Sequence, residues 1–193
     1  MTIVCEEMVK EPTTPNPDSH PHPATVSPWV ARFAPLVPAG GAVLDLACGG
    51  GRHGRLFLER GHPVTLLDRD LAGVADLERR AELLQADLEG APWPLPGRRF
   101  AGVVVTNYLW RPLFQALAQT LAEGGVLIYE TFGRGNERFG RPRNPDHLLA
   151  PNELLEAFAP TLQVVAYEHG VTGRPAVVQR LCAVRTAEPV GLD

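Results

Sequence analysis

Residues 45–54, DLACGGGRHG, have the types and spacing best suited to holding a nucleotide-like cofactor. Glycine lets the backbone approach a ligand closely, and a helix that begins after such a loop presents unpaired N–H groups to it. Gly49, Gly51 and Gly54 satisfy the G-x-G-x-x-G pattern of dinucleotide-binding proteins. Asp68 lies close to where such a fold places an acid for the ribose. The loop alone therefore leaves the kind of cofactor open.

Polar residues at the ends of three apolar runs favour a cofactor with a cationic group. Asp45 precedes Gly49 by four residues, where a carboxylate can hold an amino group and would repel a pyrophosphate. Asp87 follows another run and can accept a hydrogen bond from an exocyclic amine such as that of adenine. Thr106 closes a further run, at the edge where open α/β sheets bind ligands. Asp45, Asp68 and Asp87 are each also explained as a cap or turn residue, but hardly all three at once.

Apolar runs alternate with helical stretches along most of the chain, which predicts a mostly parallel, doubly wound α/β sheet. The predicted parallel strands are residues 42–46, 64–67, 82–85, 102–106 and 126–131, and the predicted helices are residues 27–33, 51–60, 71–80, 112–123 and 151–158. Gly124 and Gly125 are predicted to turn the chain into the fifth strand. Two further runs, 163–169 and 176–184, are joined by a short turn-like segment, which predicts an antiparallel pair at the sheet edge.

The composition fits one domain preceded by a proline-rich arm. A chain of 193 residues with 45% hydrophobic residues can bury one sizeable core, which we expect within residues 27–186. Residues 11–28 contain six prolines and almost no large apolar side chain, so residues 1–26 are predicted to be a flexible arm. Residues 187–193 are predicted to form a tail.

Charge, cysteine usage and hydropathy exclude several classes of protein. A net charge of −4 gives no general attraction to DNA. Three cysteines at unrelated spacings indicate neither a disulfide framework nor a zinc site, so we expect no metal and a reducing cytoplasm. The chain has no apolar run of roughly 18 residues and no basic, apolar start, so we expect neither a membrane partner nor secretion. A monomer and a homodimer are both compatible with this composition.

Five segments in the same order and spacing resemble the class I S-adenosylmethionine-dependent methyltransferases over roughly residues 27–186. These segments are VLDLACGGGRHG, VTLLDRD, LLQADLEG, FAGVVVTNYLW and GGVLIYETF. The stretches NYLWRPLF and YETFGRGNERFGRPRNPDHLL resemble small bacterial methyltransferases related to the tellurite-resistance type, mostly without assigned substrates. The resemblance implies a Rossmann-like sheet of seven strands, with S-adenosyl-L-methionine as cofactor and S-adenosyl-L-homocysteine as product.

The same resemblance implies a set of residues around the cofactor. They are Asp45, Cys48, Gly49 and Gly51 for the methionine moiety, Asp68 and Arg69 for the ribose, Asp87 and the Leu88 N–H for the adenine, and Thr106 for the sulfonium. The chain departs from the commonest pattern at Gly50, where many members carry a polar residue. Asp70 adds a second acid near the ribose, which leaves the identity of the ribose ligand open.

The residues that would act on the acceptor are less well defined by the sequence. Methyl transfer from a sulfonium is an in-line displacement, so holding the acceptor close and aligned supplies most of the catalysis and a base is optional. Glu130, an acid inside an apolar run, and Tyr108 are the candidate catalytic residues. Glu130 is equally well explained as the buried partner of an arginine such as Arg111. Cys48 is not expected to be a nucleophile, because its neighbour His53 is placed in a loop and not arranged to activate it.

An arginine-rich stretch, residues 133–150, is predicted to be an irregular lid. Its segment 133–147 carries a charge of +2 from four arginines against two acids. Arginine is suited to clamping a carboxylate or phosphate, so we expect a small, anionic acceptor. The residues expected to bind it are Arg111, Arg141, Arg143 and Phe132. The alternative is a solvated loop whose arginines pair with local acids.

Three other functions remain in competition with a small-molecule methyltransferase. An RNA or protein methyltransferase is compatible with the arginine-rich lid, although no recognition domain is appended. A non-catalytic module that binds the cofactor would carry the same cofactor residues. An NAD-type oxidoreductase is disfavoured, because the single lysine, Lys10, lies in the arm and no Tyr-x-x-x-Lys occurs.

Overall fold

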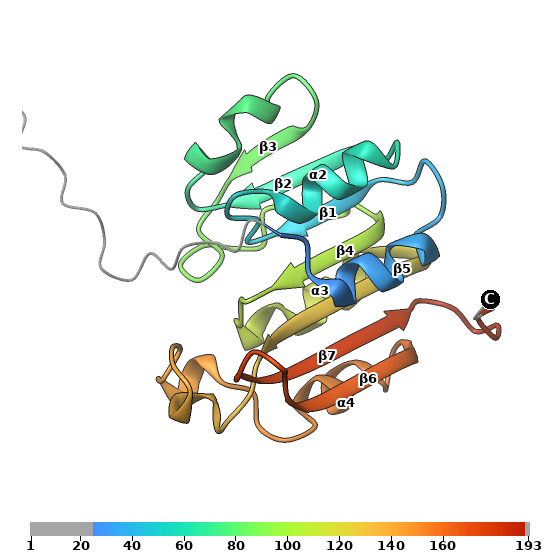
Figure 1. Cartoon of the computed structure of the whole chain (residues 1–193). Helices are drawn as coiled ribbons and strands as arrows, with labels where there is room; N and C mark the ends of the chain where they lie inside the picture. Colours follow the sequence, from blue (N-terminus) through green and yellow to red (C-terminus); the bar gives the residue numbers. More distant parts are fainter. Residues whose placement is uncertain (1–24, 192–193) are drawn as a thin grey trace, which may run out of the picture.

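The predicted strands form one seven-stranded sheet in a computed structural model that describes residues 25–191 (Figure 1). Its spatial order is β3-β2-β1-β4-β5-β7-β6. The strands are β1 (Val43–Leu46), β2 (Val64–Asp68), β3 (Glu82–Gln85), β4 (Phe100–Thr106), β5 (Leu121–Phe132), β6 (Gln163–Val171) and β7 (Val177–Val184). Strands β1 to β5 pair in parallel, and β7 runs antiparallel to both of its neighbours. The predicted Rossmann-like α/β sheet with an antiparallel C-terminal pair is therefore confirmed, with β7 inserted between β5 and β6.

Helices cover both faces of this sheet and divide the core into two apolar layers. The α-helices are α1 (Pro28–Phe33), α2 (Arg52–Glu59), α3 (Phe114–Thr120) and α4 (Glu153–Phe158). On one face, α1 and α2 bury Trp29 and Phe57 against the sheet. On the other face, α3 and α4 bury Leu117 and Phe158. The valine run of β4 is buried by both layers, as a central parallel strand requires.

Two predicted boundaries in the middle of the chain are wrong. Gly124 and Gly125 lie inside β5, which begins at Leu121 opposite Phe100, so α3 ends earlier than predicted. The pairing of β4 with β5 shifts register between Phe100 and Gly102, and the extra residues are absorbed there. A Cβ at Gly125 would lie 2.8 Å from the Phe100 carbonyl oxygen, so the close approach of the two strands requires glycine. The glycines therefore serve the strand pairing and not a turn before it.

Short 3₁₀ helices replace or extend several of the predicted helical stretches. They are η1 (Ala34–Leu36), η2 (Ala72–Leu77), η3 (Arg111–Leu113), η4 (Asn136–Arg138) and η5 (Pro145–His147). The predicted helix at 71–80 is reduced to η2, where Gly73 lies against the glycine loop: a Cβ at Gly73 would be 3.1 Å from the Gly49 carbonyl oxygen. This close contact fixes η2 beside the loop that follows β1.

The chain enters the folded domain at Ser27, which caps α1. Its hydroxyl oxygen accepts a hydrogen bond from the Trp29 N–H at 3.1 Å, and Pro28 occupies the first helical position. Most of the arm predicted at residues 1–26 lies outside the described residues, as do the last two residues of the predicted tail. None of the helices within residues 25–191 combines the length and apolar content needed to cross a bilayer.

Candidate functional site

The loop between β1 and α2 holds the glycines predicted to approach a cofactor. Gly49 and Gly51 have positive φ angles of 53° and 68°, in the region that favours glycine. A Cβ at Gly51 would lie 2.5 Å from Val74 Cγ1, and one at Gly54 would lie 2.3 Å from Leu66 Cδ2. The loop therefore lies close to η2, and α2 packs tightly on β2. These glycines therefore have conformational and packing roles within the fold.

Asp45 lies beneath this loop at the end of β1 and is almost completely buried. Its carboxylate accepts a hydrogen bond from the Gly54 N–H at 2.8 Å, which satisfies one of the unpaired donors at the start of α2. Burial raises the pKa of Asp45 to about 7, although the Gly54 N–H and the Arg52 charge oppose the shift. Asp45 thus fixes α2 to β1 and holds a titratable carboxyl group under the loop.

Asp68 connects the end of β2 to the glycine loop. Its Oδ2 accepts a hydrogen bond from the Gly49 N–H at 2.8 Å, and its Oδ1 accepts one from the Asp70 N–H at 3.1 Å. Asp70 in turn accepts a hydrogen bond from the Ala72 N–H at 2.9 Å, so its carboxylate takes part in the turn before η2. The two acids therefore have different surroundings: Asp68 is tied to the loop, and Asp70 is an exposed turn residue.

The predicted adenine-binding residues lie in the turn after β3. Asp87 is exposed, and its Oδ1 accepts a hydrogen bond from the Glu89 N–H at 2.9 Å, which is the geometry of an Asx turn. Leu88 is buried in the core layer under α3 and α4. Arg69, at the end of β2, is exposed, and its carbonyl oxygen accepts a hydrogen bond from the Gln85 side chain at 2.9 Å. The ends of β2 and β3 are thus held together beside Asp68.

Cys48 is buried at the start of the loop, with its sulfur 3.9 Å from the Gly49 carbonyl oxygen. Burial raises the pKa of its thiol above the ordinary range, and Asp45 and Asp68 reinforce the shift. The thiol therefore stays protonated near neutral pH and has no thiolate character. This environment agrees with the expectation that Cys48 is not a nucleophile.

Arg52 and His53 form a polar cluster with Thr106 that the sequence analysis missed. His53 lies in the first turn of α2, inside the helix predicted at residues 51–60, so its expected place in a loop is wrong, and its side chain is only 2% exposed. Arg52 donates from Nε to His53 Nε2 and from Nη2 to Thr106 Oγ1, both at 3.2 Å. Burial, with the Arg52 charge, lowers the pKa of His53 to about 3, so the imidazole is neutral. The only signal for these two residues in the sequence was their position directly after Gly51, the last of three consecutive glycines in the loop.

Glu130, near the end of β5, is paired on both carboxylate oxygens. Oε1 accepts a hydrogen bond from the Ser27 hydroxyl at 3.0 Å, and Oε2 accepts one from Arg180 Nε in an ion pair. The cross-strand register places Glu130 directly opposite Arg180 on β7. The alternative that Glu130 pairs with an arginine is therefore confirmed, but the arginine is Arg180 and not Arg111. The insertion of β7 next to β5, which brings this pair together, cannot be read from local sequence.

Arg111 instead ties the C-terminal end of the insert to α4. It forms a bidentate ion pair with Glu153 and donates hydrogen bonds to the carbonyl oxygens of Asp146 and Leu148, at 2.6 and 2.9 Å. The Glu153 carboxylate raises the pKa of Arg111 further above its ordinary value. With these contacts, Arg111 has a structural role at the base of the insert.

Tyr108 follows β4, and its hydroxyl is buried without a hydrogen-bond partner in the described part of the chain. Burial, with the nearby negative charge of Glu89, raises the pKa of Tyr108 above its ordinary range. The phenol therefore remains protonated near neutral pH and cannot take a proton from an acceptor. Its backbone carbonyl oxygen accepts a hydrogen bond from the Tyr129 hydroxyl at 3.0 Å, which fixes the segment after β4.

The predicted lid, residues 133–150, extends from the carboxyl end of β5, on the side of the sheet where β4 also ends (Figure 1). It is pinned by Asn136, which is 2% exposed. The Asn136 amide donates to the Arg141 carbonyl oxygen and accepts from the Val177 N–H, both at 3.2 Å. Arg141 and Arg143 are exposed, and Phe132 is half-buried at the start of the insert. The insert is thus a folded loop that carries exposed arginines.

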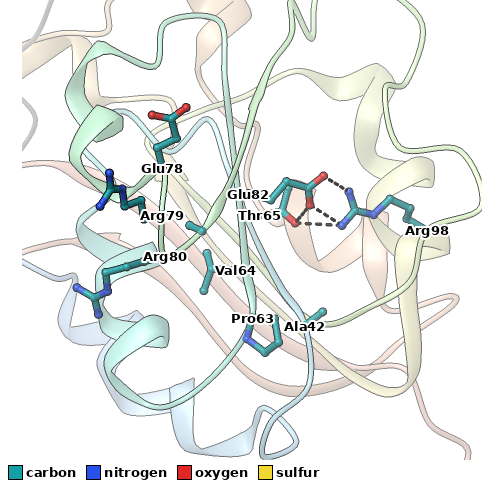
Figure 2. A pocket seen from close by; sticks show the side chains of 10 residues that line it. Ala42, Pro63, Val64, Thr65, Glu78, Arg79, Arg80, Glu82 and Arg98 are labelled. Carbon is teal, nitrogen blue, oxygen red and sulfur yellow. Dashed lines mark hydrogen bonds and ion pairs between the residues drawn. The ribbon is translucent and has the colours of Figure 1, made fainter.

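A hollow of about 300 Å³ lies at the opposite edge, where β1, β2 and β3 begin (Figure 2). Its lining includes Arg79 and Arg80, and an interaction network of Thr65, Glu82 and Arg98 crosses one side. The glycine loop and the ends of the parallel strands lie at the other edge of the sheet. Within the described residues, no group of three or more His, Cys, Asp or Glu side chains is arranged to hold a metal ion.

Comparisons with known proteins agree with this arrangement. Residues 43–125 match the sequence profile of a methyltransferase domain. A search of curated proteins finds no match to the chain. Among solved structures, the fold is similar to TehB from Haemophilus influenzae, with a TM-score of 0.64 and 17% identity over 81% of this chain and 61% of that one. The chain thus spans less than two thirds of that relative.

Two further solved structures are covered more fully. A TehB-like SAM-dependent methyltransferase from Corynebacterium glutamicum has a TM-score of 0.60 and 18% identity, over 81% of this chain and 86% of that one. An S-adenosylmethionine-dependent methyltransferase from Mesorhizobium loti has a TM-score of 0.64 and 21% identity, over 81% of this chain and 97% of that one. At these identities the likeness concerns the fold.

Proposed function

We propose that this chain is an S-adenosylmethionine-dependent methyltransferase that methylates a small, anionic acceptor, because residues 43–125 match a methyltransferase-domain profile and the fold is similar to that of solved methyltransferases. The observation that carries the proposal is the hydrogen bond from the Gly49 N–H to the Asp68 carboxylate, which joins the glycine loop to the end of β2. A carboxylate at this junction lies beside the backbone that would approach the cofactor. The cofactor would supply an activated methyl group as its sulfonium.

The cofactor would extend along the ends of four neighbouring strands. Asp68, with Arg69 beside it, would hold the ribose hydroxyls, and Asp87 with the Leu88 N–H would frame the adenine. The methionine moiety would lie against the glycine loop. That part of the site comprises Asp45, Cys48, Gly49 and Gly51, with Thr106 next to the sulfonium. The separate surroundings of Asp68 and Asp70 support Asp68 as the ribose ligand.

Transfer would proceed by in-line displacement, with catalysis from alignment and exclusion of water. The environments of the described side chains support a reaction without a protein base. Tyr108 keeps its proton, His53 is neutral with Nε2 occupied, and both oxygens of Glu130 are paired. Tyr108 would then contact the acceptor as a wall of the site. Glu130 would be a positioning residue that acts through Ser27 and Arg180.

The exposed arginines of the insert would recognise the anionic group of the acceptor. Arg141 and Arg143 lie on the segment between Asn136 and η5, at the end of the sheet where the parallel strands finish. Phe132 would provide an apolar contact at the start of the insert. Arg111 is now assigned to the base of the insert, because its guanidinium is already bound to Glu153 and two carbonyl oxygens.

The cofactor proposal predicts a rise in melting temperature with adenosyl ligands and none with NAD. A ligand at about 100 times its Kd adds roughly 2.7 kcal/mol to the free energy of unfolding. For a domain of this size the melting temperature should rise by about 5 to 11 °C with S-adenosylhomocysteine or S-adenosylmethionine. Differential scanning fluorimetry measures the shift. A rise with NAD alone would contradict the proposal.

The lid proposal predicts that Arg141→Ala and Arg143→Ala raise the KM for the acceptor and leave kcat unchanged. Loss of one hydrogen bond to a charged group should raise KM by about 10- to 100-fold. A screen of small acids, thiols and RNA, using methyl-labelled cofactor, provides the acceptor. Arg79→Ala is the matched control, because Arg79 is also exposed but lies at the opposite edge of the sheet. If the unmodified protein and all three variants had the same KM for the acceptor, the insert would be excluded as the acceptor-binding element.

A further inference from the structure

Only two large apolar side chains are exposed within residues 25–191, and both lie at the end of the sheet where the insert begins. Phe139 of the insert is 43% exposed, and Val171, the last residue of β6, is 60% exposed. The insert lies beside the turn between β6 and β7 (Figure 1), because Asn136 binds Val177, which is paired with Val171. We call residues 137–143 together with residues 171–175 the insert–hairpin surface.

This surface also carries positive charge. Arg138, Arg143 and Arg174 are exposed, and the guanidinium carbon of Arg138 lies 5.6 Å from the centre of the Phe139 ring. Among the described residues, no carboxylate forms an ion pair with any of these three arginines. The acid within the surface, Glu137, accepts a hydrogen bond from a backbone N–H. Exposed apolar side chains flanked by cations are complementary to a segment that is both apolar and acidic.

The first residues of the chain have that composition. Residues 1–24, which lie outside the described residues, have a net charge of −3 from four acids against one lysine. Their large apolar side chains all fall within the first nine residues, at Met1, Ile3, Val4, Met8 and Val9. Residues 11–24 contain five prolines and no large apolar side chain, so they have the composition of a connector. An apolar, acidic segment is thus tethered to the folded domain by a proline-rich stretch.

We infer that residues 2–9, TIVCEEMV, dock on the insert–hairpin surface of the same chain. Their aliphatic side chains would cover Phe139 and Val171, and Glu6 and Glu7 would lie beside the exposed arginines. Burial of apolar area and attraction between opposite charges would then act together. On the proposed function, the docked acids would compete with an anionic acceptor for Arg143, so the segment would restrain access to the insert.

The point where the described chain begins favours docking within one chain. The Ser27 hydroxyl donates to Glu130, near the end of β5. Arg180, which pairs with Glu130, is three residues from Val177 on β7, so about 10 Å of strand separates the tether from the insert–hairpin surface. A proline-rich connector of the length of residues 11–24 spans up to about 40 Å. The tether is therefore long enough, and it gives the segment a high effective concentration at this surface.

The hollow at the opposite edge of the sheet is also lined by arginines, but it does not have the same character (Figure 2). Arg79 and Arg80 lie there with Glu78 and Glu82, so the charges are mixed. The two exposed large apolar side chains lie at the other end of the sheet. The hollow therefore offers control positions of matched charge and exposure.

Paramagnetic NMR on the full chain tests the inference without cofactor or acceptor, so its outcome is independent of the proposed function. A nitroxide label attaches to Cys5, because Cys48 and Cys182 are buried and burial raises the pKa of both thiols. In nitrogen-15-labelled protein, we expect the nitroxide to broaden the backbone amide resonances of the insert–hairpin surface and not those of residues 78–82. The broadening should decrease at high ionic strength, because salt screens exposed charges.

Charge reversal tests the electrostatic part of the docking. Arg138→Glu combined with Arg174→Glu should lower the equilibrium constant for docking at least about fivefold, which is measured as a loss of broadening. Arg79→Glu combined with Arg80→Glu is the matched control, because it makes the same change of charge at two exposed arginines of the hollow. This control should keep the broadening.

Phe139→Ser combined with Val171→Ser tests the apolar part and should also lower the equilibrium constant at least about fivefold. Both positions are exposed, and unchanged chemical shifts in the strands would show that the variant is folded. Broadening that neither this variant nor the charge reversal reduces would overturn the inference.

A mixed sample separates docking within one chain from docking between copies. It contains nitrogen-15-labelled Cys5→Ser protein, which carries no nitroxide, and nitroxide-labelled protein without nitrogen-15. Docking within one chain predicts no broadening in this sample. Broadening of the insert–hairpin surface in the mixed sample would assign the surface to a second copy and overturn the inference. The absence of selective broadening in the doubly labelled chain would overturn it as well.

Discussion

Replacing Asp68 with alanine is expected to weaken the binding of S-adenosylhomocysteine by about a hundredfold or more. The variant loses the carboxylate that would hold the ribose hydroxyls, and charge-assisted hydrogen bonds contribute roughly 1.5 to 3 kcal/mol each. It also leaves the Gly49 N–H without the partner that positions the glycine loop. Since 1.4 kcal/mol corresponds to a tenfold change in Kd, even two such losses reach the expected effect. Isothermal titration calorimetry measures the Kd directly.

Asp70→Ala is the matched control for this experiment. Asp70 is also an acid in the same turn, but its carboxylate bonds to the Ala72 N–H and not to the glycine loop. We expect the Kd of the Asp70→Ala variant for S-adenosylhomocysteine to stay within about threefold of that of the unmodified protein. The missing turn contact should cause a small loss of stability. If Asp70→Ala lost affinity and Asp68→Ala did not, Asp70 would be the ribose ligand.

Replacing Asp45 with asparagine is expected to stabilise the protein near pH 8 while weakening cofactor binding. The folded-state pKa of Asp45 is raised from 3.8 to about 7 by burial, so the folded protein keeps a proton that the unfolded chain releases above about pH 4. The free energy of unfolding of the unmodified protein therefore falls as pH rises from about 4 to 7. With about 1.4 kcal/mol per pKa unit, the loss is of the order of 4 kcal/mol at most.

Asparagine can still accept the hydrogen bond from the Gly54 N–H but does not titrate. Thermal melts between about pH 4 and pH 8 should therefore converge for the two proteins at the acid end and separate by about 10 °C at the alkaline end. Asp76→Asn is the control, because Asp76 is exposed and its pKa is lowered by Arg55. If the difference in melting temperature between Asp45→Asn and the unmodified protein did not depend on pH, the raised pKa of Asp45 would be contradicted.

The same carboxyl group links cofactor binding to proton release. An amino group placed beside Asp45 favours its charged form and lowers its pKa. Binding near pH 7 should then release a proton, and the calorimetric enthalpy should depend on the ionisation enthalpy of the buffer. In Asp45→Asn this buffer dependence should vanish and the affinity should fall. These two effects separate a cofactor contact from a purely structural cap.

The sequence was sufficient to predict the features that depend on local pattern. The valine run at 102–106 predicted a strand buried on both faces, and the positions of Asp45, Asp68 and Thr106 followed from the strand ends, since parallel strands finish at one edge of a sheet. The start of β5 was mispredicted, because Gly124 and Gly125 are common in turns and the register shift against Phe100 depends on a distant strand.

The parts of the site that were missed depend on contacts between distant segments. Glu130 meets Arg180 only because β7 is inserted next to β5, and it meets Ser27 only because α1 lies over the same face. Arg52 and His53 were visible in the loop sequence, but their roles depend on Thr106 from another strand. Side-chain direction at the first turn of a helix cannot be read from spacing alone.

The buried amide of Asn136 separates the exposed part of the insert from the strands that carry it. Asn136 closes residues 136–141 into a small loop and fastens this loop to Val177 of β7, next to the backbone hydrogen bond from the Gly133 N–H to the Val177 carbonyl oxygen. Residues 137–140 can therefore differ in composition without disturbing the strands or the glycine loop. Grafting residues 137–143 from a relative, with Asn136 retained, would exchange the arginines proposed to bind the acceptor on an unchanged cofactor-binding framework.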